Sequence, residues 1–76
     1  MNNYKKNYTY KGYTITYSEQ YEIWEIEPRN KTIQETERIY NNLELPTFST
    51  LAFAKSYLKE NKDQIDNLIE NFLNPQ

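Results

Sequence analysis

The stretch FSTLAFAKSYLKENKDQIDNLIENFL, residues 48–73, carries the strongest periodic pattern in the chain. Ser49 is a suitable N-cap, and Phe48 is placed to contact Phe53 as a hydrophobic staple. After this start, one set of positions recurs at alternating intervals of three and four residues, the spacing of one helix face: Leu51, Ala54, Leu58, Asn61, Ile65, Leu68 and Phe72. The pattern predicts helix over residues 49–73.

The polar Asn61 interrupts the middle of this apolar stripe and leaves two arrangements open. One long helix continues through Asn61, or two helices meet there, with Asp63 as the N-cap of the second. A single helix would extend well beyond the width of a small sheet. Its second half would then need a fold-back or a second chain, and we expect a homodimer because the stripe keeps its phase through Asn61. The residues concerned are Ile65, Leu68, Ile69, Phe72 and Leu73.

The first part of the chain has the alternation of β-strands. From Tyr8 onward the side chains alternate as in a strand, with Tyr13, Ile15 and Tyr17 on one face. Thr14, Thr16 and Ser18 lie on the other face, and the alternation leaves open which face of the hairpin is buried. Gly12 suits a bulge or sharp bend within this strand, because glycine tolerates a positive φ. A turn at residues 18–20 leads to a second alternating stretch, residues 21–27. Together the two stretches predict an antiparallel hairpin.

Residues 32–40, TIQETERIY, fit either a strand or a helix. A helix would gain a capping box between Thr32 and Glu35, and its apolar stripe would consist of Ile33, Thr36, Tyr40 and Leu43. The preceding turn at residues 28–31 and the Thr, Ile and Tyr content suit a strand. We therefore favour a third antiparallel strand.

These elements predict one α+β domain spanning residues 1–76. A flexible N-terminus covers residues 1–7, and a three-stranded antiparallel meander covers residues 8–40. One long helix or two consecutive helices, within residues 49–73, pack against one face of that sheet.

Composition excludes several classes of function. The chain has no Cys, no His and a single Gly, so it lacks disulfides, thiolate nucleophiles, Cys- or His-based zinc sites, histidine acid–base catalysis and glycine-rich phosphate loops. The remaining Asp, Glu, Lys and Tyr chemistry needs an enclosed pocket that 76 residues can hardly form. We therefore expect no enzymatic activity, no catalytic or metal-binding residues and no cofactor. The absence of a long apolar run and of a signal peptide favours a cytoplasmic protein without a membrane segment.

Tyrosines and glutamates supply the candidate binding surfaces. Tyrosine is enriched in protein interfaces, and the N-terminal strands hold most of the eight tyrosines. The glutamates of residues 19–44 could mimic phosphates toward a basic partner, or they could form a solvated face that protects edge strands. The residues selected as a candidate protein interface are Tyr8, Tyr10, Tyr13, Tyr17, Glu35, Glu37, Ile65, Leu68, Ile69 and Phe72.

Three blocks resemble small proteins of phages and other mobile elements: YKGYTI at residues 10–15, the strand around Trp24, and FSTLAFAKSYL at residues 48–58. Those proteins share a K-G-Y-x-I opening strand and an F-x-[ST]-L-x-x-A-K helix start. The resemblance implies a strand-strand-strand-helix order and a non-enzymatic protein-binding role, in its sharpest form inhibition of a host defence complex such as CRISPR. The segments 31–45 and 62–76 extend beyond the shared pattern, and a protein-specific role is expected there.

The same order of elements also resembles, more weakly, the DNA-binding domains of the AP2 and integrase amino-terminal type. Such domains read the major groove with a sheet face rich in Arg and Lys. Residues 21–40 of this chain carry more acidic than basic side chains, so nucleic acid is not the expected partner. The alternative function is a nucleic-acid-binding accessory protein that uses a face of Tyr, Thr and Lys, including Lys5, Lys6 and Lys11.

Overall fold

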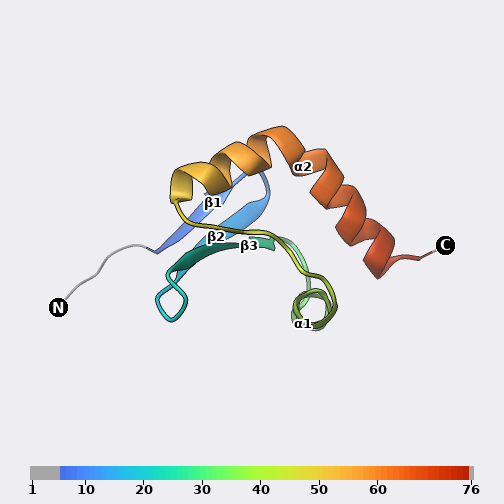
Figure 1. Ribbon diagram of the computed structural model, residues 1–76. Helices are drawn as coiled ribbons and strands as arrows, with labels where there is room; N and C mark the ends of the chain where they lie inside the picture. Colours follow the sequence, from blue (N-terminus) through green and yellow to red (C-terminus); the bar gives the residue numbers. More distant parts are fainter. Residues whose placement is uncertain (1–5, 76) are drawn as a thin grey trace.

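The computed structural model describes residues 6–75. Within these residues, four strands and two helices follow one another: β1 (Asn7–Tyr10), β2 (Tyr13–Ser18), β3 (Ile23–Pro28), α1 (Ile33–Asn42), β4 (Thr47–Phe48) and α2 (Leu51–Leu73). The strands form one antiparallel sheet in the order β1-β2-β3-β4, and α2 crosses over the sheet (Figure 1). The predicted α+β class, with an antiparallel three-stranded meander against a C-terminal helix, is confirmed.

The three long strands come from a shorter stretch of sequence than predicted. Lys11 and Gly12 both have a positive φ, of 52° and 83°, and they form a two-residue turn between Tyr10 and Tyr13. Positive φ at both central positions is typical of the tight hairpin turns that match strand twist. The expected bend at Gly12 is therefore a complete reversal, and residues 8–18 form two strands instead of one.

The predicted third strand at residues 32–40 is wrong, and with it the extension of the sheet to residue 40, because these residues form α1. The Glu35 N–H donates to Thr32 Oγ1 over 3.1 Å, and the Thr32 N–H donates to Glu35 Oε1 over 3.0 Å. This capping box gives hydrogen-bond acceptors to two backbone N–H groups at the helix start, those of Thr32 and Glu35. A strand would have placed Glu35 and Glu37 on the same face as Ile39, whereas the helix buries Ile39 alone.

The helix α2 is continuous through Asn61, so the two-helix arrangement is wrong. The Asn61 amide donates to the Tyr57 carbonyl oxygen over 3.2 Å, which satisfies its side chain without breaking the helix. Figure 1 shows that α2 bends along its length. Local side-chain bonds to the carbonyl four residues earlier are known to accompany helix bending.

The start of α2 also differs from the prediction. Thr50 is the N-cap instead of Ser49, and its hydroxyl accepts a hydrogen bond of 3.1 Å from the Phe53 N–H. The Phe53 side chain is 61% exposed and forms no staple with Phe48. Phe48 packs against Tyr57 instead, with ring centroids 5.2 Å apart.

The core lies between the sheet, α1 and α2. The sheet contributes Tyr13, Ile15 and Ile26, whereas the helices contribute Ile39, Ala54, Leu58, Ile65 and Ile69. Residues directly opposite each other in an antiparallel sheet share a face. The strand register therefore places Tyr8, Tyr10, Tyr17, Trp24 and Phe48 on this inner face, whereas the outer face carries Asn7, Thr9, Thr14, Thr16, Glu25, Glu27 and Thr47.

The second half of α2 is covered by α1, which the sequence-based expectation did not include. Ile65 and Ile69 are 4% and 1% exposed within the single chain. Arg38 of α1 lies over the Phe72 ring, at 5.2 Å from its centroid. Leu68 remains 46% exposed. The homodimer stays a prediction, but of the five apolar residues that motivated it two are buried, Phe72 and Leu73 are half-buried and Leu68 is exposed.

The expected flexible segment, residues 1–7, lies largely outside the described residues, and Asn7 already belongs to β1.

Candidate protein-binding groove

The residues selected from the sequence as an interface occupy different environments. Tyr13, Ile65 and Ile69 are buried in the core of the single chain. Glu35 forms the α1 capping box, whereas Glu37 and Leu68 are exposed. The others, Tyr8, Tyr10, Tyr17 and Phe72, are half-buried. The ten residues therefore do not form one binding surface.

The half-buried tyrosines of the sheet form an aromatic cluster around Trp24. The Tyr17 and Tyr8 rings lie 5.1 Å and 5.9 Å from the Trp24 ring, measured between centroids. Lys6 Nζ lies 4.5 Å from the Tyr17 centroid, and Lys55 Nζ lies 5.6 Å from that of Tyr8. These rings contact one another and the inner face of the sheet, so they are not an open platform of separate rings.

A cavity of about 470 Å³ lies between β3, α1 and the segment that connects α1 to β4. We call it the α1–β3 groove. Half of its lining is apolar: Ile26, Pro28, Ile39, Leu43, Leu45 and Pro46. The other half is polar or acidic: Glu25, Glu27, Thr36, Tyr40, Glu44 and Thr47. Neither the tyrosines of the N-terminal strands nor the apolar stripe of residues 51–72 line this groove.

The groove exists because β4 is too short to cover β3. The β4 strand pairs only with Trp24 and Glu25, and continuing this register would place Pro46 opposite Ile26. Proline lacks the N–H that the ladder requires, which explains why β4 begins only after Pro46. The rest of β3 faces α1 across the groove, with Ile39 buried and Leu43 half-buried on the helix side.

The rim of the groove is negatively charged. Glu25 and Glu27 are two residues apart in β3, so both carboxylates lie on the outer face of the sheet. The Tyr40 hydroxyl donates to Glu25 Oε1 over 3.2 Å. Burial raises the pKa of Tyr40, and the negative charges of Glu25 and Glu27 raise it further. A phenol is neutral at ordinary pH even with its usual pKa, and this raised pKa extends the range over which it donates to Glu25.

The ion pairs formed by the described residues lie elsewhere. They are Lys6–Glu19 at 3.4 Å, Lys31–Glu70 at 2.9 Å and Lys62–Asp66. None of them neutralises Glu25, Glu27 or Glu44. Over residues 6–75 there is also no group of three or more acidic side chains arranged to hold a metal ion. The groove is thus an apolar hollow with a negative rim.

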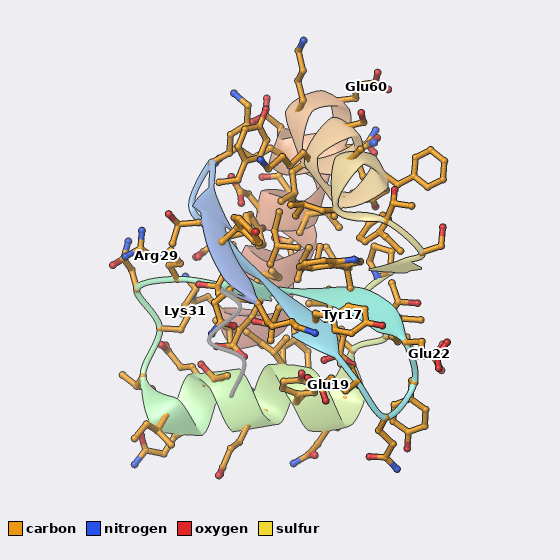
Figure 2. The ribbon with its side chains drawn as sticks, turned by 90° about the vertical axis from the view of Figure 1, so that its left-hand side faces the viewer. Tyr17, Glu19, Glu22, Arg29, Lys31 and Glu60 are labelled. Atoms are coloured by element: carbon orange, nitrogen blue, oxygen red, sulfur yellow. The ribbon has the colours of Figure 1, made fainter. Side chains whose placement is uncertain are left out.

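The acidic stretch noted in the sequence is divided by the fold. Glu19 and Glu22 lie at the β2–β3 turn, as Figure 2 shows, and Glu37 is exposed on α1. Of the seven glutamates, only Glu25, Glu27 and Glu44 reach the groove. The signal that points to it was the helical alternative for residues 32–40, because that stripe contains Thr36, Tyr40 and Leu43, which all line the groove.

A second hollow, of about 330 Å³, lies beside Gly12 and the middle of α2. The Tyr13 hydroxyl donates to Asp66 Oδ1 over 2.7 Å, and Lys62 also donates to Asp66. Burial raises the pKa of Asp66, but the hydrogen bonds from Lys62 and Tyr13 outweigh it, and the net pKa is lowered. Lys62 pairs with Asp66 and Lys31 pairs with Glu70 at this hollow, so four of its charged groups already have partners within the fold and we interpret the hollow as structural.

Comparison with family models, curated proteins and solved structures finds no match for this chain. None of the helices in residues 6–75 is long and apolar enough to cross a membrane. A functional proposal therefore rests on the residues and their geometry.

Proposed function

We propose that this protein is a non-enzymatic protein-binding module and that the α1–β3 groove receives a segment of the partner. The observation that carries the proposal is the groove itself, a hollow of about 470 Å³ whose lining is half apolar. Sites that recognise a ligand are typically concave and apolar, with a few polar groups at defined positions. Tyr40 at the rim is 59% exposed, and tyrosine is enriched among the residues that dominate binding energy.

The groove lies at one of the two segments, residues 31–45, for which the sequence predicts a protein-specific role. The helix α1 and the segment after it belong to residues 31–45, which extend beyond the pattern shared with small phage and mobile-element proteins. In its most specific form, the proposal is that the protein is a phage-encoded inhibitor that binds a component of a host defence complex in the cytoplasm. The resemblance of residues 10–15 and 48–58 to those proteins supports this form.

Site-specific crosslinking tests the use of the groove. The photoreactive residue p-benzoylphenylalanine replaces Tyr40 at the rim or, as a control, Tyr21 at the β2–β3 turn, which is similarly exposed at 65%. We expect a protein adduct from host lysate at position 40 and none at position 21. Filling the groove by Thr36→Trp should abolish the adduct, whereas Gln34→Trp, on an exposed position of α1, should preserve it.

Equal adducts at both positions, or an adduct that survives Thr36→Trp, would refute the groove as the binding site. Circular dichroism of both tryptophan variants shows whether α1 remains folded, so that loss of the adduct is assigned to the groove.

The nucleic-acid alternative draws support from the aromatic cluster, where Lys6 and Lys55 lie over the rings of Tyr17 and Tyr8. Lysine side chains at this position are suited to contact a strand backbone, and base stacking would be limited to the exposed parts of these half-buried rings. Binding to mixed single-stranded DNA and RNA at about 50 and 200 mM salt discriminates the two functions. Micromolar binding that weakens steeply with salt would make nucleic acid the primary partner.

The homodimer is a separate proposal. It now depends on Leu68, the exposed apolar residue of the C-terminal part of α2. Sedimentation equilibrium at tens of micromolar should report twice the chain mass, and Leu68→Glu should restore the monomer. A monomeric unaltered protein would refute the dimer and leave the groove proposal intact.

A further inference from the structure

We propose that the segment received by the α1–β3 groove is basic: an arginine or lysine whose charged end pairs with Glu25 and Glu27, next to an apolar residue that lies on the groove floor. This inference rests on the proposed function and adds the chemistry of the partner segment.

The floor of the groove is suited to the apolar part of such a segment. Ile26 and Ile39 are 4% and 2% exposed, so the floor is fixed by the core of the protein. Leu43, Leu45 and Pro46 are only half-buried and complete the apolar wall. The volume of about 470 Å³ corresponds to roughly sixteen water molecules at the bulk volume of ~30 Å³ each. It therefore has room for a long side chain together with an apolar neighbour.

Arginine and lysine match a groove that combines such a floor with a negative rim. Both side chains bury their methylene groups along apolar surface while the charged end stays at the polar boundary. In the groove, this boundary is the outer face of β3, where Glu25 and Glu27 lie two residues apart. The Tyr40 hydroxyl holds Glu25 by a hydrogen bond of 3.2 Å, so one carboxylate is already positioned. The exposed Tyr40 ring also offers a surface for a cation.

Charge complementarity selects a cationic occupant over the other classes. The carboxylates of Glu25, Glu27 and Glu44 take part in none of the ion pairs of residues 6–75. Several basic side chains lie over aromatic rings instead: Lys11 over Tyr10, Arg38 over Phe72 and Lys55 over Tyr8. A neutral or acidic segment would desolvate the rim carboxylates without pairing them, which is unfavourable. A basic segment pairs them.

Peptide binding with matched variants tests the inference. The probe is a fluorescein-labelled peptide, Gly-Ser-Leu-Arg-Leu-Arg-Leu-Ser-Gly, whose binding is followed by fluorescence polarisation. One comparison peptide carries citrulline in place of arginine, which keeps the shape and removes the charge. Another carries serine in place of leucine, which keeps the charge and removes the apolar groups. Each comparison peptide should bind about tenfold more weakly, or worse, equivalent to about 1.4 kcal/mol.

Two double variants separate the groove from the overall charge of the protein. Glu25→Gln with Glu27→Gln removes two charges at the groove, and Glu19→Gln with Glu22→Gln removes two charges at the β2–β3 turn. We expect the first to weaken binding of the arginine peptide about tenfold or more, and the second about twofold or less. Circular dichroism confirms that both variants keep the fold.

Three results would overturn the inference: equal binding of the citrulline peptide, equal binding of the serine peptide, or equal loss in the two double variants. A free polyamine would be the ligand instead if two results were found together: spermine displaces the arginine peptide, and the serine peptide binds as well as the arginine peptide. If the arginine and citrulline peptides bind equally but Thr36→Trp still abolishes the crosslink from position 40, the inference of a basic segment is wrong and the proposed function of the groove stands. If that adduct is absent, the proposed function fails.

Discussion

The hydrogen bond between Tyr13 and Asp66 joins the first hairpin to the second half of α2 and gives a direct test of how the fold is held together. The Tyr13 ring is 2% exposed, and its hydroxyl donates to Asp66 Oδ1 over 2.7 Å, between residues 53 positions apart. The substitution Tyr13→Phe removes this hydroxyl and leaves the packing of the ring unchanged. We therefore expect it to report the hydrogen bond with little contribution from the core.

The magnitude follows from the charge and exposure of the acceptor. A hydrogen bond to a charged group contributes about 1.5–3 kcal/mol to stability. The Asp66 side chain is 37% exposed and also accepts from Lys62, so water and the lysine compensate part of the loss. We expect Tyr13→Phe to lower the free energy of unfolding by about 1–2 kcal/mol, a large share of the 5–15 kcal/mol typical of a domain.

Urea denaturation followed by the fluorescence of Trp24, the single tryptophan, measures this change. The matched control is Tyr10→Phe, because Tyr10 is half-buried on the same sheet face and faces Tyr13 across the hairpin. We expect the control to change the free energy of unfolding by less than about 0.5 kcal/mol. If Tyr13→Phe were no more destabilising than the control, the hydrogen bond would not stabilise the fold.

The same pair of groups predicts the dependence of stability on pH. Burial, followed by the hydrogen bond to Asp66, raises the pKa of Tyr13 above its ordinary value of 10.0. A raised pKa in the folded state means that this contribution is complete below pH ~10 and declines as the pH rises further. Asp66 has a lowered pKa, so its contribution is complete above pH ~4 and is lost as the pH falls through the folded-state value. The alkaline decline should be weaker in Tyr13→Phe, and an unchanged profile would contradict the assignment.

Three further substitutions test separate parts of the structure by the same urea assay. Thr32→Ala should lower stability by about 1 kcal/mol, because it removes the capping box of α1, and an unchanged value would show that α1 does not need its cap. Leu58→Ala should cost about 2–5 kcal/mol, since this side chain is 0% exposed, and a cost below 1 kcal/mol would place Leu58 outside the core. Gly12→Ala should lower stability by about 1 kcal/mol, because alanine is strained at the Gly12 φ of +83°. The nearest atom to the added Cβ is Lys62 Cε at 3.9 Å, which is too far to clash. A much larger loss of stability would therefore refute the backbone explanation.

The elements that could be predicted from the sequence are those whose pattern is local and long. The stripe of α2 extends over six turns, and its period indicates a helix whatever surrounds it. The hairpins around residues 8–27 are likewise indicated by alternation. The reversal at Lys11-Gly12 was missed because a single glycine within an alternating stretch is consistent with a bulge as well as with a turn.

The state of residues 32–40 depended on tertiary structure. Their Thr, Ile and Tyr content favours a strand, whereas Thr32 and Glu35 favour a helix start, and the two signals are of similar strength. Once Lys11-Gly12 makes β1 and β2 separate strands, the three-stranded meander is complete at Pro28. A helix at α1 then places Ile39 in the same core cluster as Ile65 and Ile69 of α2, and Arg38 over the Phe72 ring.

The groove could not be predicted for the same reason, because its residues come from three segments that only the fold brings together. Glu25 and Glu27 belong to β3, Tyr40 to α1, and Glu44 to the segment after α1. In the sequence they are members of a dispersed acidic stretch that a solvated face explains equally well. The helical state of α1 turns Tyr40 toward Glu25, and the hollow stays open because β4 begins only after Pro46 and pairs with just two residues of β3.

Because α1 covers α2 on one side and forms the groove on the other, stability and binding are coupled through it. A substitution at Ile39, which is 2% exposed and also lines the groove, should impair both properties. Glu25 and Glu27 contribute to the rim and not to the core, so their replacement by glutamine should impair binding while the urea midpoint changes little. Two results together would support a groove built on the core. Ile39→Ala should lower both stability and binding, and the glutamine variants should lower binding without lowering stability. A binding loss that always follows a loss of stability would instead show that the groove has no recognition role of its own.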